Sequence, residues 1–384
     1  MKETGAFPHR SWETLPLFGI CLSQNMAEKG RMDMSRQFSG SGGIGRDVSM
    51  DLGTAWVRVA VKGKGLLLQE PAVAAVDRQT GQVLQVGHAA HEMLGRTPGQ
   101  LLAVRPLAKG VISDFTIAQA MIQSFLKMAL SGRLVKPRLL IGVPSGISEV
   151  EERAVVEVGL QAGARRVYLM EAPLAAALGA GVDAAQPEGS LVVDLGAGTT
   201  DAAILSLDGV VAAACLPLGG DTLDEALIQY VRQKHNLLLG LRTAEEVKRT
   251  IGHVGNVEET QTMEIKGRCL NTGLPRDITL TGEETAEAFA PTADKILTAV
   301  QGVLEHTPPE LATDVAKGGI LLTGGGSLLR GMDKLLAEAT GIQVTVAEEP
   351  ALCTVLGLEK TLSDLNKRQE GPMQFARRRQ VGAG

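Results

Sequence analysis

The clearest hydrophobic pattern lies near the middle of the chain, where one apolar run enters a glycine turn and another leaves it. Residues 191–204 read LVVDLGAGTTDAAI, with a carboxylate, Asp194, just before the turn. An apolar run of this length bounded by glycines is typical of a buried β-strand. Glycines let backbone N–H groups approach an anion closely, and threonine hydroxyls add donors. The pattern therefore predicts a β-hairpin that is either an ordinary turn or a phosphate-binding loop.

The same order of residues recurs in two other places. Residues 48–59 read VSMDLGTAWVRV and place Asp51 where the central stretch places Asp194. A third glycine turn, in residues 323–331 (TGGGSLLRG), follows another apolar run. A carboxylate at a strand end can hold a hydrated Mg²⁺ beside phosphates. The repetition therefore predicts two similar half-domains that hold one nucleotide between them.

Elsewhere the apolar positions change between helical spacing and strand-like runs, which is typical of an α/β protein. Helical spacing predicts helices over residues 115–130, 149–163, 174–179, 223–234, 286–304 and 328–339. Apolar or alternating runs predict strands over residues 138–143, 166–170 and 343–347, and a β-ribbon over 257–282. A further helix is expected from Thr243, which could cap it with Glu246 completing a capping box.

Composition narrows the class of protein. At 384 residues the chain exceeds one typical hydrophobic core, so two or more subdomains are expected. The net charge of −5 argues against a large nucleic-acid-binding surface. The four cysteines are scattered without metal-ligand spacing, which predicts reduced thiols and a cytosolic protein. No apolar run approaches the roughly 20 residues that span a bilayer.

The three glycine motifs, in this order and with the sequence between them, resemble those of the actin/sugar-kinase/heat-shock-chaperone ATPase superfamily. Within it, residues 47–365 resemble the bacterial actin MreB family, including the segments LGRTP (94–98) and RP (105–106). The resemblance implies an actin-like ATPase fold, with two similar ribonuclease H-like α/β halves around a nucleotide cleft and a small subdomain inserted in each. The implied boundaries are 47–74, 116–185 and 346–365 for the first large subdomain, 75–115 for its insert, 186–221 and 285–345 for the second, and 222–284 for its insert.

The two ends of the chain lie outside this resemblance. Residues 1–46 fit a disordered tail, a start codon assigned too early, since Met32 and Met34 lie closer to the usual family start, or a membrane-touching segment over 12–22 (WETLPLFGICL). These three readings stay open. Residues 366–384 form a basic tail that we expect to be solvated.

The resemblance also assigns roles in binding ATP and Mg²⁺. Asp51 and Asp194 would hold Mg²⁺ through water, and the triple-glycine turn would approach the adenosine side. One face of a helix would flank the ribose and base, although for Glu245 and Lys248 alone a solvated salt bridge is the competing reading. The implied nucleotide-binding residues are Asp51, Gly53, Thr54, Ala55, Trp56, Asp194, Gly196, Ala197, Gly198, Thr199, Glu245, Glu246, Val247, Lys248, Gly324, Gly325, Gly326 and Ser327.

Three departures from the family pattern bear on activity. The family's water-positioning glutamate, just before a proline, is Ala172 here, which leaves the neighbouring Glu171 as the catalytic candidate. The usual asparagine of the first loop is Trp56, whose indole would turn outward or crowd the phosphates. After Pro350 only Gly357 remains of a glycine-rich turn. Because phosphoryl transfer depends on positioning, we expect bound nucleotide to be hydrolysed slowly or not at all.

The function implied by the resemblance is that of a cell-shape cytoskeletal protein. Such a protein forms head-to-tail filaments on the inner face of the membrane and guides the cell-wall synthesis machinery. Leu134 and Val135, beside Arg133 and Lys136, occupy the place of the family's membrane-inserting pair; a plain loop is the alternative. Two other readings stay open, a co-assembling regulatory paralogue without ATPase activity and a soluble ATPase of the same superfamily.

Overall fold

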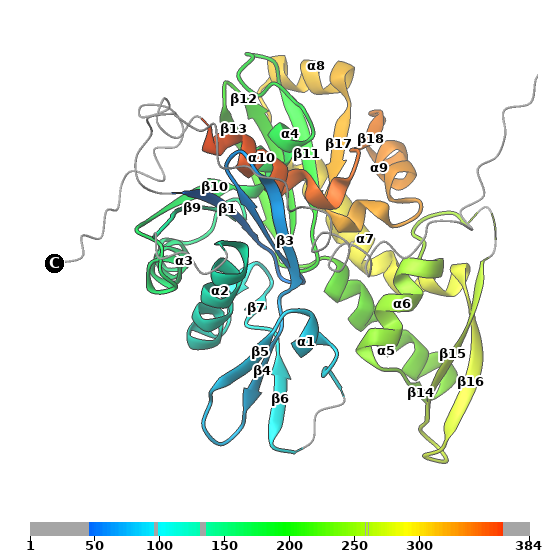
Figure 1. Cartoon of the computed structure of the whole chain (residues 1–384). Coiled ribbons are helices and arrows are strands. Elements are labelled where there is room, and N and C mark those ends of the chain that lie inside the picture. The colour runs from blue at the N-terminus through cyan, green and yellow to red at the C-terminus, as the bar shows by residue number, and fades with distance from the viewer. Residues whose placement is uncertain (1–45, 96–98, 131–135, 258, 260, 364–384) are drawn as a thin grey trace, which may run out of the picture. The chain divides into compact units, whose positions relative to one another are not determined.

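The structure is a computed structural model that describes residues 46–95, 99–130, 136–257, 259 and 261–363 (Figure 1). The predictions for residues 1–45 and 364–384 lie outside the described residues, as does the expected membrane contact of Leu134 and Val135. No helix in the described part of the chain is long and apolar enough to cross a membrane.

Two five-stranded sheets form the two halves, and they share one topology. In each, the first strand of a three-stranded antiparallel meander pairs in parallel with one later strand, which pairs in parallel with another. The first sheet has the order β10-β9-β1-β2-β3, with β1 Asp47–Leu52, β2 Trp56–Val61, β3 Gly65–Pro71, β9 Arg138–Val143 and β10 Arg166–Glu171. The second has the order β13-β12-β11-β17-β18, with β11 Ser190–Leu195, β12 Thr200–Ser206, β13 Gly209–Leu216, β17 Ile320–Thr323 and β18 Val344–Val346. The prediction of two similar α/β halves is confirmed.

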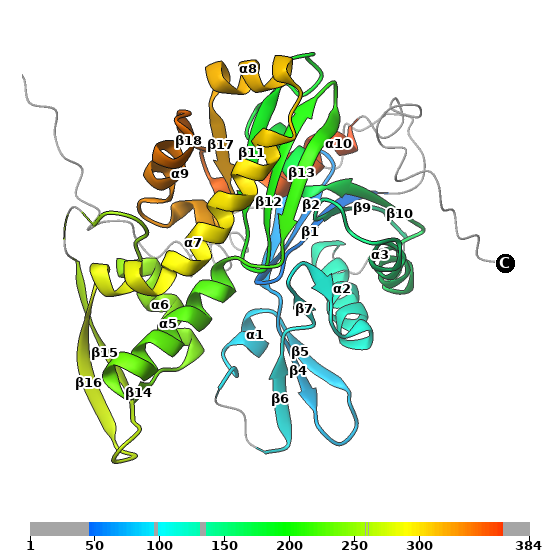
Figure 2. The ribbon, with the colours of Figure 1, turned by 180° about the vertical axis from the view of Figure 1, so that it is seen from behind.

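Helices cover both sheets because their apolar faces bury the strand side chains. Against the first sheet, α2 (Phe115–Leu130) and α3 (Glu149–Gln161) pack with Phe125 at the centre of the core. Against the second sheet lies the long helix α7 (Gly282–Glu305), with Phe289 fully buried (Figure 2). The other helices of this half are α5 Gly220–His235, α6 Leu241–Ile251, α8 Pro309–Gly318 and α9 Met332–Thr340.

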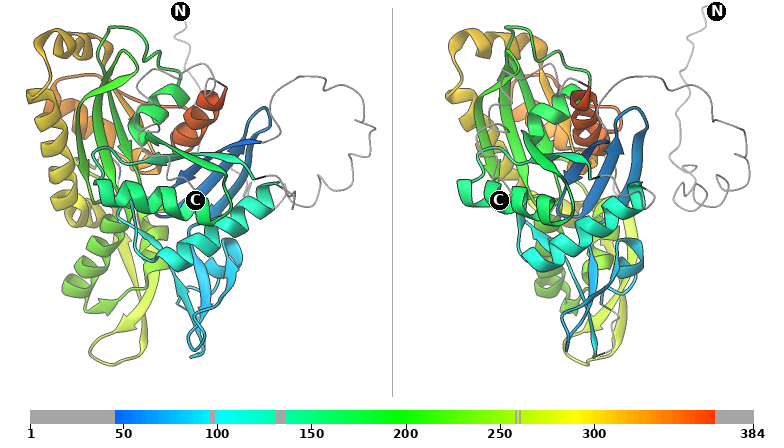
Figure 3. Two further views of the ribbon diagram at one scale, coloured as in Figure 1. Left: turned by 90° about the vertical axis from the view of Figure 1, so that its left-hand side faces the viewer. Right: turned by 60° about the vertical axis from the view of Figure 1, so that its left-hand side comes forward.

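Two further helices lie between the sheets. Helix α10 (Cys353–Leu362, red in Figure 3) contacts β1, β2 and β9 of the first sheet. Helix α4 (Ala172–Gly179) packs against α10 and also against β11 and β12 of the second sheet. These two helices therefore join the halves.

A small sheet is inserted in each half. The first has the order β5-β4-β6 and carries the short helix α1, with β4 Ala74–Asp77, β5 Val83–Val86, α1 His88–His91 and β6 Leu101–Val104. It is followed by the pair β7 Leu107–Ala108 and β8 Val111–Ile112. The second has the order β14-β15-β16, with β14 Leu237–Leu238, β15 Thr262–Cys269 and β16 Pro275–Thr281. The subdomain boundaries themselves stay predictions.

Some element ends differ from the sequence-based expectation. Helix α6 begins at Leu241 after Gly240 and has no side-chain cap, so the capping box expected at Thr243 is wrong. The helix expected over 328–339 is present as α9, which begins only at Met332, and the short 3-10 helix η2 (Gly325–Leu328) precedes it. The β-ribbon expected over 257–282 is present as β15 and β16.

Candidate nucleotide site

The structure brings together the acidic strand ends of the two halves. Asp51 lies near the end of β1 and Asp194 near the end of β11. Burial, together with the charges of Asp201 and Asp51, raises the pKa of Asp194 to about 7. Burial also raises the pKa of Asp51, although Arg58 opposes this rise. The two carboxylates predicted to act together therefore do repel one another across the halves.

The glycine turns that follow these strands touch each other. A side chain at Gly198, in the second turn, would collide with the hydroxyl of Thr54 in the first. Thr54 is buried, and its hydroxyl accepts a hydrogen bond from the Gly110 N–H at 3.3 Å. Gly196 N–H donates to Thr199 O at 2.8 Å and closes the second turn. The two hairpins predicted to bind phosphate thus face one another, each from a different half.

The triple-glycine turn lies directly beside the second hairpin. Gly324 has a φ of 78°, and a side chain there would meet Asp194 and the carbonyl of Leu195. Thr323, just before it, donates its hydroxyl to Asp194 Oδ1 at 3.2 Å. Ser327 Oγ donates to Gly324 O at 2.7 Å, so this hydroxyl stabilises the turn itself. A side chain at Gly325, by contrast, would point into open space.

The helix expected beside the ribose and base is linked to the second hairpin through its lysine. Lys248 Nζ donates to Gly220 O at 2.9 Å and forms an ion pair with Asp224 at 2.8 Å. Gly220 N–H donates in turn to Gly196 O at 3.0 Å. Asp224 and the Gly220 carbonyl therefore hold this lysine, and not the salt bridge with Glu245 that was the competing expectation. Sequence reasoning did not find Asp224, although it lies just after the GGD segment (219–221), near the start of α5.

The neighbouring residues of α6 differ in exposure. Glu246 is exposed, Glu245 is partly buried, and the Val247 side chain is fully buried in the core of the second half. Of Val247, only the backbone is left to face a ligand. The roles assigned to these residues in binding stay predictions.

Glu171 ends β10, and Ala172 begins α4. Glu171 Oε2 accepts a hydrogen bond from Ser145 Oγ at 2.6 Å. The backbone N–H of Ser145 donates to Asp201 Oδ1 at 2.9 Å, so Ser145 links the two halves. Ser145 and Asp201 are site neighbours that the motifs did not reveal; Asp201 lies only two residues after Thr199.

The indole of Trp56 packs on the first small subdomain. Its ring meets that of His88 edge to face, with centroids 5.7 Å apart and an interplanar angle of 66°. The indole was expected either to turn outward or to crowd the phosphates. The structure shows the ring turned towards α1. Gly357, the glycine left after Pro350, lies in α10, where it contacts α4.

The donor set suits a hydrated Mg²⁺ on the Asp194 side. Asp194 also accepts the hydroxyl of Thr354 at 3.5 Å, so two hydroxyls fix its carboxylate. Among the described residues, no group of three or more acidic, histidine or cysteine side chains is placed to hold a metal unaided. Mg²⁺ is commonly held by one or two carboxylates together with waters and substrate phosphates. Asp51 differs, because Arg58 already pairs with it at 2.9 Å.

Most of the chain is similar to proteins of one family. The model of the MreB/Mbl protein family matches residues 45–370. The cell shape-determining protein MreB of Escherichia coli is 45% identical over 335 residues, which are 86% of this chain and 96% of that protein. The crystal structure of MreB 5 of Spiroplasma citri bound to AMPPNP is 34% identical, with a TM-score of 0.79 over 85% of this chain and 98% of that one. The MamK double helical filament, 23% identical, has a TM-score of 0.72 over 83% and 99%. The expected actin-like fold is confirmed.

Proposed function

The chain belongs to the MreB/Mbl family of cell shape-determining actin homologues, and we propose that it binds ATP between the two hairpins and assembles head to tail into filaments. The observation that carries this proposal is the contact between the turns at Gly198 and Thr54. It brings the two glycine turns and the carboxylates of Asp51 and Asp194 close together, and turns of this kind bind phosphate chains through their backbone N–H groups. The AMPPNP bound to the Spiroplasma relative supports the proposal that this chain binds a nucleotide.

Mg²⁺ would supply positive charge beside the phosphates when it is bound. Asp194 would hold it through water, because Thr323 and Thr354 fix its carboxylate. A cation there would also relieve the repulsion between Asp194, Asp51 and Asp201.

Assembly follows from the two-halved fold and from the family. Nucleotide that contacts both halves favours the arrangement in which they are close, which is a shift of population by differential affinity. Head-to-tail contacts between copies are heterologous and give open filaments rather than closed rings. MamK, a chain of the same fold, forms a double helical filament. We place the filaments on the inner membrane surface through Leu134 and Val135, where they would guide cell-wall synthesis.

A second candidate is a filament subunit that regulates a hydrolysing relative by co-assembly. Ala172 favours it, because the carboxylate that orients water in the family is missing from that position. In both cases the chain binds nucleotide, and the two differ in turnover.

The test is nucleotide binding and assembly of the purified chain. Calorimetry with AMPPNP measures binding, and sedimentation with and without anionic liposomes measures filaments and membrane attachment. We expect AMPPNP to bind and to increase the pelleted fraction, and anionic liposomes to increase it further. Absence of AMPPNP binding, or binding without any assembly, would contradict the proposal.

A matched pair of glycine variants ties binding to this site. A side chain at Gly325 meets nothing within 4 Å, so Gly325→Val should fold normally while filling the open space beside the second hairpin. Gly318→Val, equally unobstructed but at the end of α8, is the control. We expect Gly325→Val to lose AMPPNP affinity at unchanged melting temperature, and Gly318→Val to keep both. Equal affinity in the two variants would place the nucleotide elsewhere.

A further inference from the structure

Arg58 is a charged side chain inside the first phosphate-binding hairpin. It lies on β2 directly opposite Asp51 of β1 in the antiparallel register. Its Nη1 is 2.9 Å from Asp51 Oδ2, and the two side chains are only 11% and 16% exposed. The pair therefore sits in the low-dielectric surroundings of the site and not on the solvent face of the hairpin.

The guanidinium has bonding capacity that the protein leaves unused. Its Nε is buried and has no hydrogen-bond partner within the described residues. A guanidinium carries five N–H donors in a planar fork, and burying such donors unpaired is costly. The fork matches the geometry of phosphate oxygens, which it binds bidentately. An anion such as a phosphate would therefore satisfy this donor.

The position of Arg58 also bears on the metal. Its charge acts on Asp51 and, through space, on Asp194. Asp51 is already paired with a fixed cation, so it gains less from a divalent ion than an unpaired carboxylate would. Positive charge that Mg²⁺ would bring to the first hairpin is thus present in the protein itself.

We propose that Arg58 is a phosphate-binding residue that takes over part of the charge role of Mg²⁺, so that this chain binds a nucleoside triphosphate with little dependence on the metal. This inference rests on the proposed nucleotide-binding function. It assigns Arg58 to the phosphates and not to the base, so its contribution should grow with the number of phosphates.

The first experiment needs no variant. Binding of AMPPNP and of AMP to the wild-type chain is measured by calorimetry in Mg²⁺ and in EDTA. We expect the Kd for AMPPNP to rise less than about threefold when Mg²⁺ is removed, because charge-assisted bonds from Arg58 remain. A rise of about a hundredfold would overturn the inference while leaving the nucleotide-binding function intact. Absence of AMPPNP binding in both buffers would overturn the proposed function and the inference with it.

Variants then test the residue. Arg58→Leu should weaken AMPPNP binding in EDTA by about 10- to 100-fold, which is the usual loss of affinity when hydrogen bonds to a charged group are removed. It should leave AMP binding nearly unchanged and make AMPPNP binding depend on Mg²⁺. Arg58→Lys, which keeps the charge without the fork, should lose only about three- to tenfold. The control is Arg153→Leu, because Arg153 is 61% exposed on α3 and pairs with an exposed glutamate.

Melting curves accompany each variant, because Arg58→Leu leaves Asp51 without its partner. If that variant has no cooperative transition, Arg58→Lys and the wild-type comparison decide the question. AMPPNP affinity in EDTA that is equal for wild type and a folded Arg58→Leu would overturn the inference, since Arg58 would then only neutralise Asp51.

Discussion

At the residue scale, the adjacent residues Glu171 and Ala172, at the junction of β10 and α4, differ in whether they could orient a water molecule. The carboxylate of Glu171 is held by the Ser145 hydroxyl at 2.6 Å, on the segment that follows β9. Ala172 begins α4 and carries no group that could orient a water molecule. Consecutive side chains point in different directions, so Glu171 is not a ready substitute for a carboxylate at 172.

Restoring a carboxylate at position 172 should restore hydrolysis. We expect Ala172→Glu to raise the rate of phosphate release from ATP by about 10²- to 10⁴-fold, the usual contribution of a positioned general base. Phosphate release is measured on the assembled protein at saturating ATP. The control is Ala185→Glu, which adds the same carboxylate at an exposed position outside the site. Unchanged release by a folded, AMPPNP-binding Ala172→Glu would show that water positioning is not what limits turnover.

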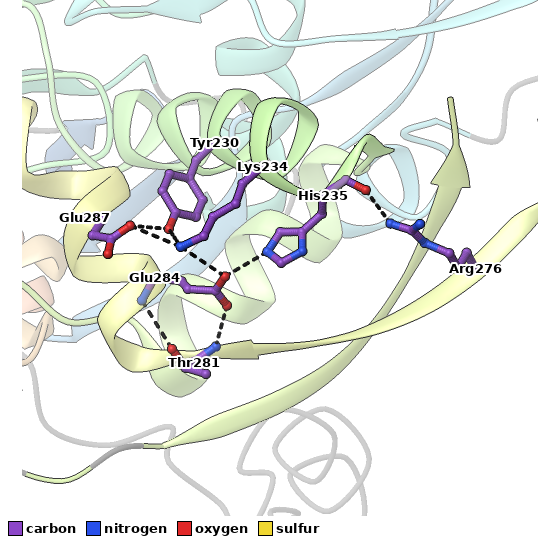
Figure 4. Close-up of polar contacts among 7 residues, drawn as sticks. All are labelled: Tyr230, Lys234, His235, Arg276, Thr281, Glu284 and Glu287. Atoms are coloured by element: carbon purple, nitrogen blue, oxygen red, sulfur yellow. Dashed lines mark hydrogen bonds and ion pairs between the residues drawn. The ribbon is translucent and has the colours of Figure 1, made fainter. Parts of the chain in front are cut away.

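At the scale of elements, one buried glutamate fixes the start of α7 and its contact with α5 (Figure 4). Glu284 accepts the Thr281 N–H at 3.1 Å, and Thr281 accepts the Glu284 N–H, which completes a capping box. The same carboxylate lies 2.8 Å from His235 Nε2 and 3.5 Å from Lys234 Nζ, both near the end of α5. This explains why the helix begins four residues before the expected 286.

Glu284 and Glu287 offer a matched pair for measuring that contribution. Glu284→Ala should lower the free energy of unfolding by about 1–3 kcal/mol, because it removes a cap and leaves the Thr281 N–H and the partly buried His235 side chain without this partner. Glu287→Ala should cost under about 1 kcal/mol, because Glu287 is 61% exposed in its pairing with Lys234. Urea unfolding followed by circular dichroism measures both. Equal losses in the two variants would mean that burial does not set the strength of this network.

At the scale of the whole molecule, the repeated hairpins allowed the two halves to be predicted because their pattern is local. An apolar strand followed by a carboxylate and a glycine turn predicts the same hairpin wherever it occurs. Asp51 and Asp194 could therefore be assigned to one site from the sequence. Contacts that depend on register or on distant packing could not. Arg58 meets Asp51 only through the β1–β2 register, and Lys248 meets Asp224 only because α6 packs against α5.

The same reasoning explains why the joint between the halves was not foreseen. The pattern near Gly357 was interpreted as the remnant of a loop motif, but it is a helix packed on α4. Ala175 and Leu358 lie in the cluster that this contact buries. The need for glycine there arises from a helix some 180 residues earlier in the chain and leaves no local signal.

The joint is also where a small change should have the largest structural effect. A side chain at Gly357 would collide with the backbone carbonyl of Ala175, and one at Gly179 with that of Cys353. Because a backbone atom cannot swing aside as a flexible side chain can, α4 and α10 would have to separate. We expect Gly357→Ala to lower the free energy of unfolding by about 1–3 kcal/mol, the usual cost of overpacking. Urea unfolding of the whole chain measures the loss.

The control for this variant is the same substitution in a helix with room for it. A side chain at Gly302, inside α7, meets nothing within 4 Å, so Gly302→Ala should stabilise the fold by about 0.5–1 kcal/mol through the unfolded state. Changes of opposite sign in the free energy of unfolding would show that the close approach of the two helices, and not helix propensity, requires glycine at position 357. Because α4 contacts the second sheet and α10 the first, Gly357→Ala should also weaken AMPPNP binding, which needs both hairpins correctly placed relative to one another. A variant at 357 as stable as the wild type would contradict this account of how the halves are joined.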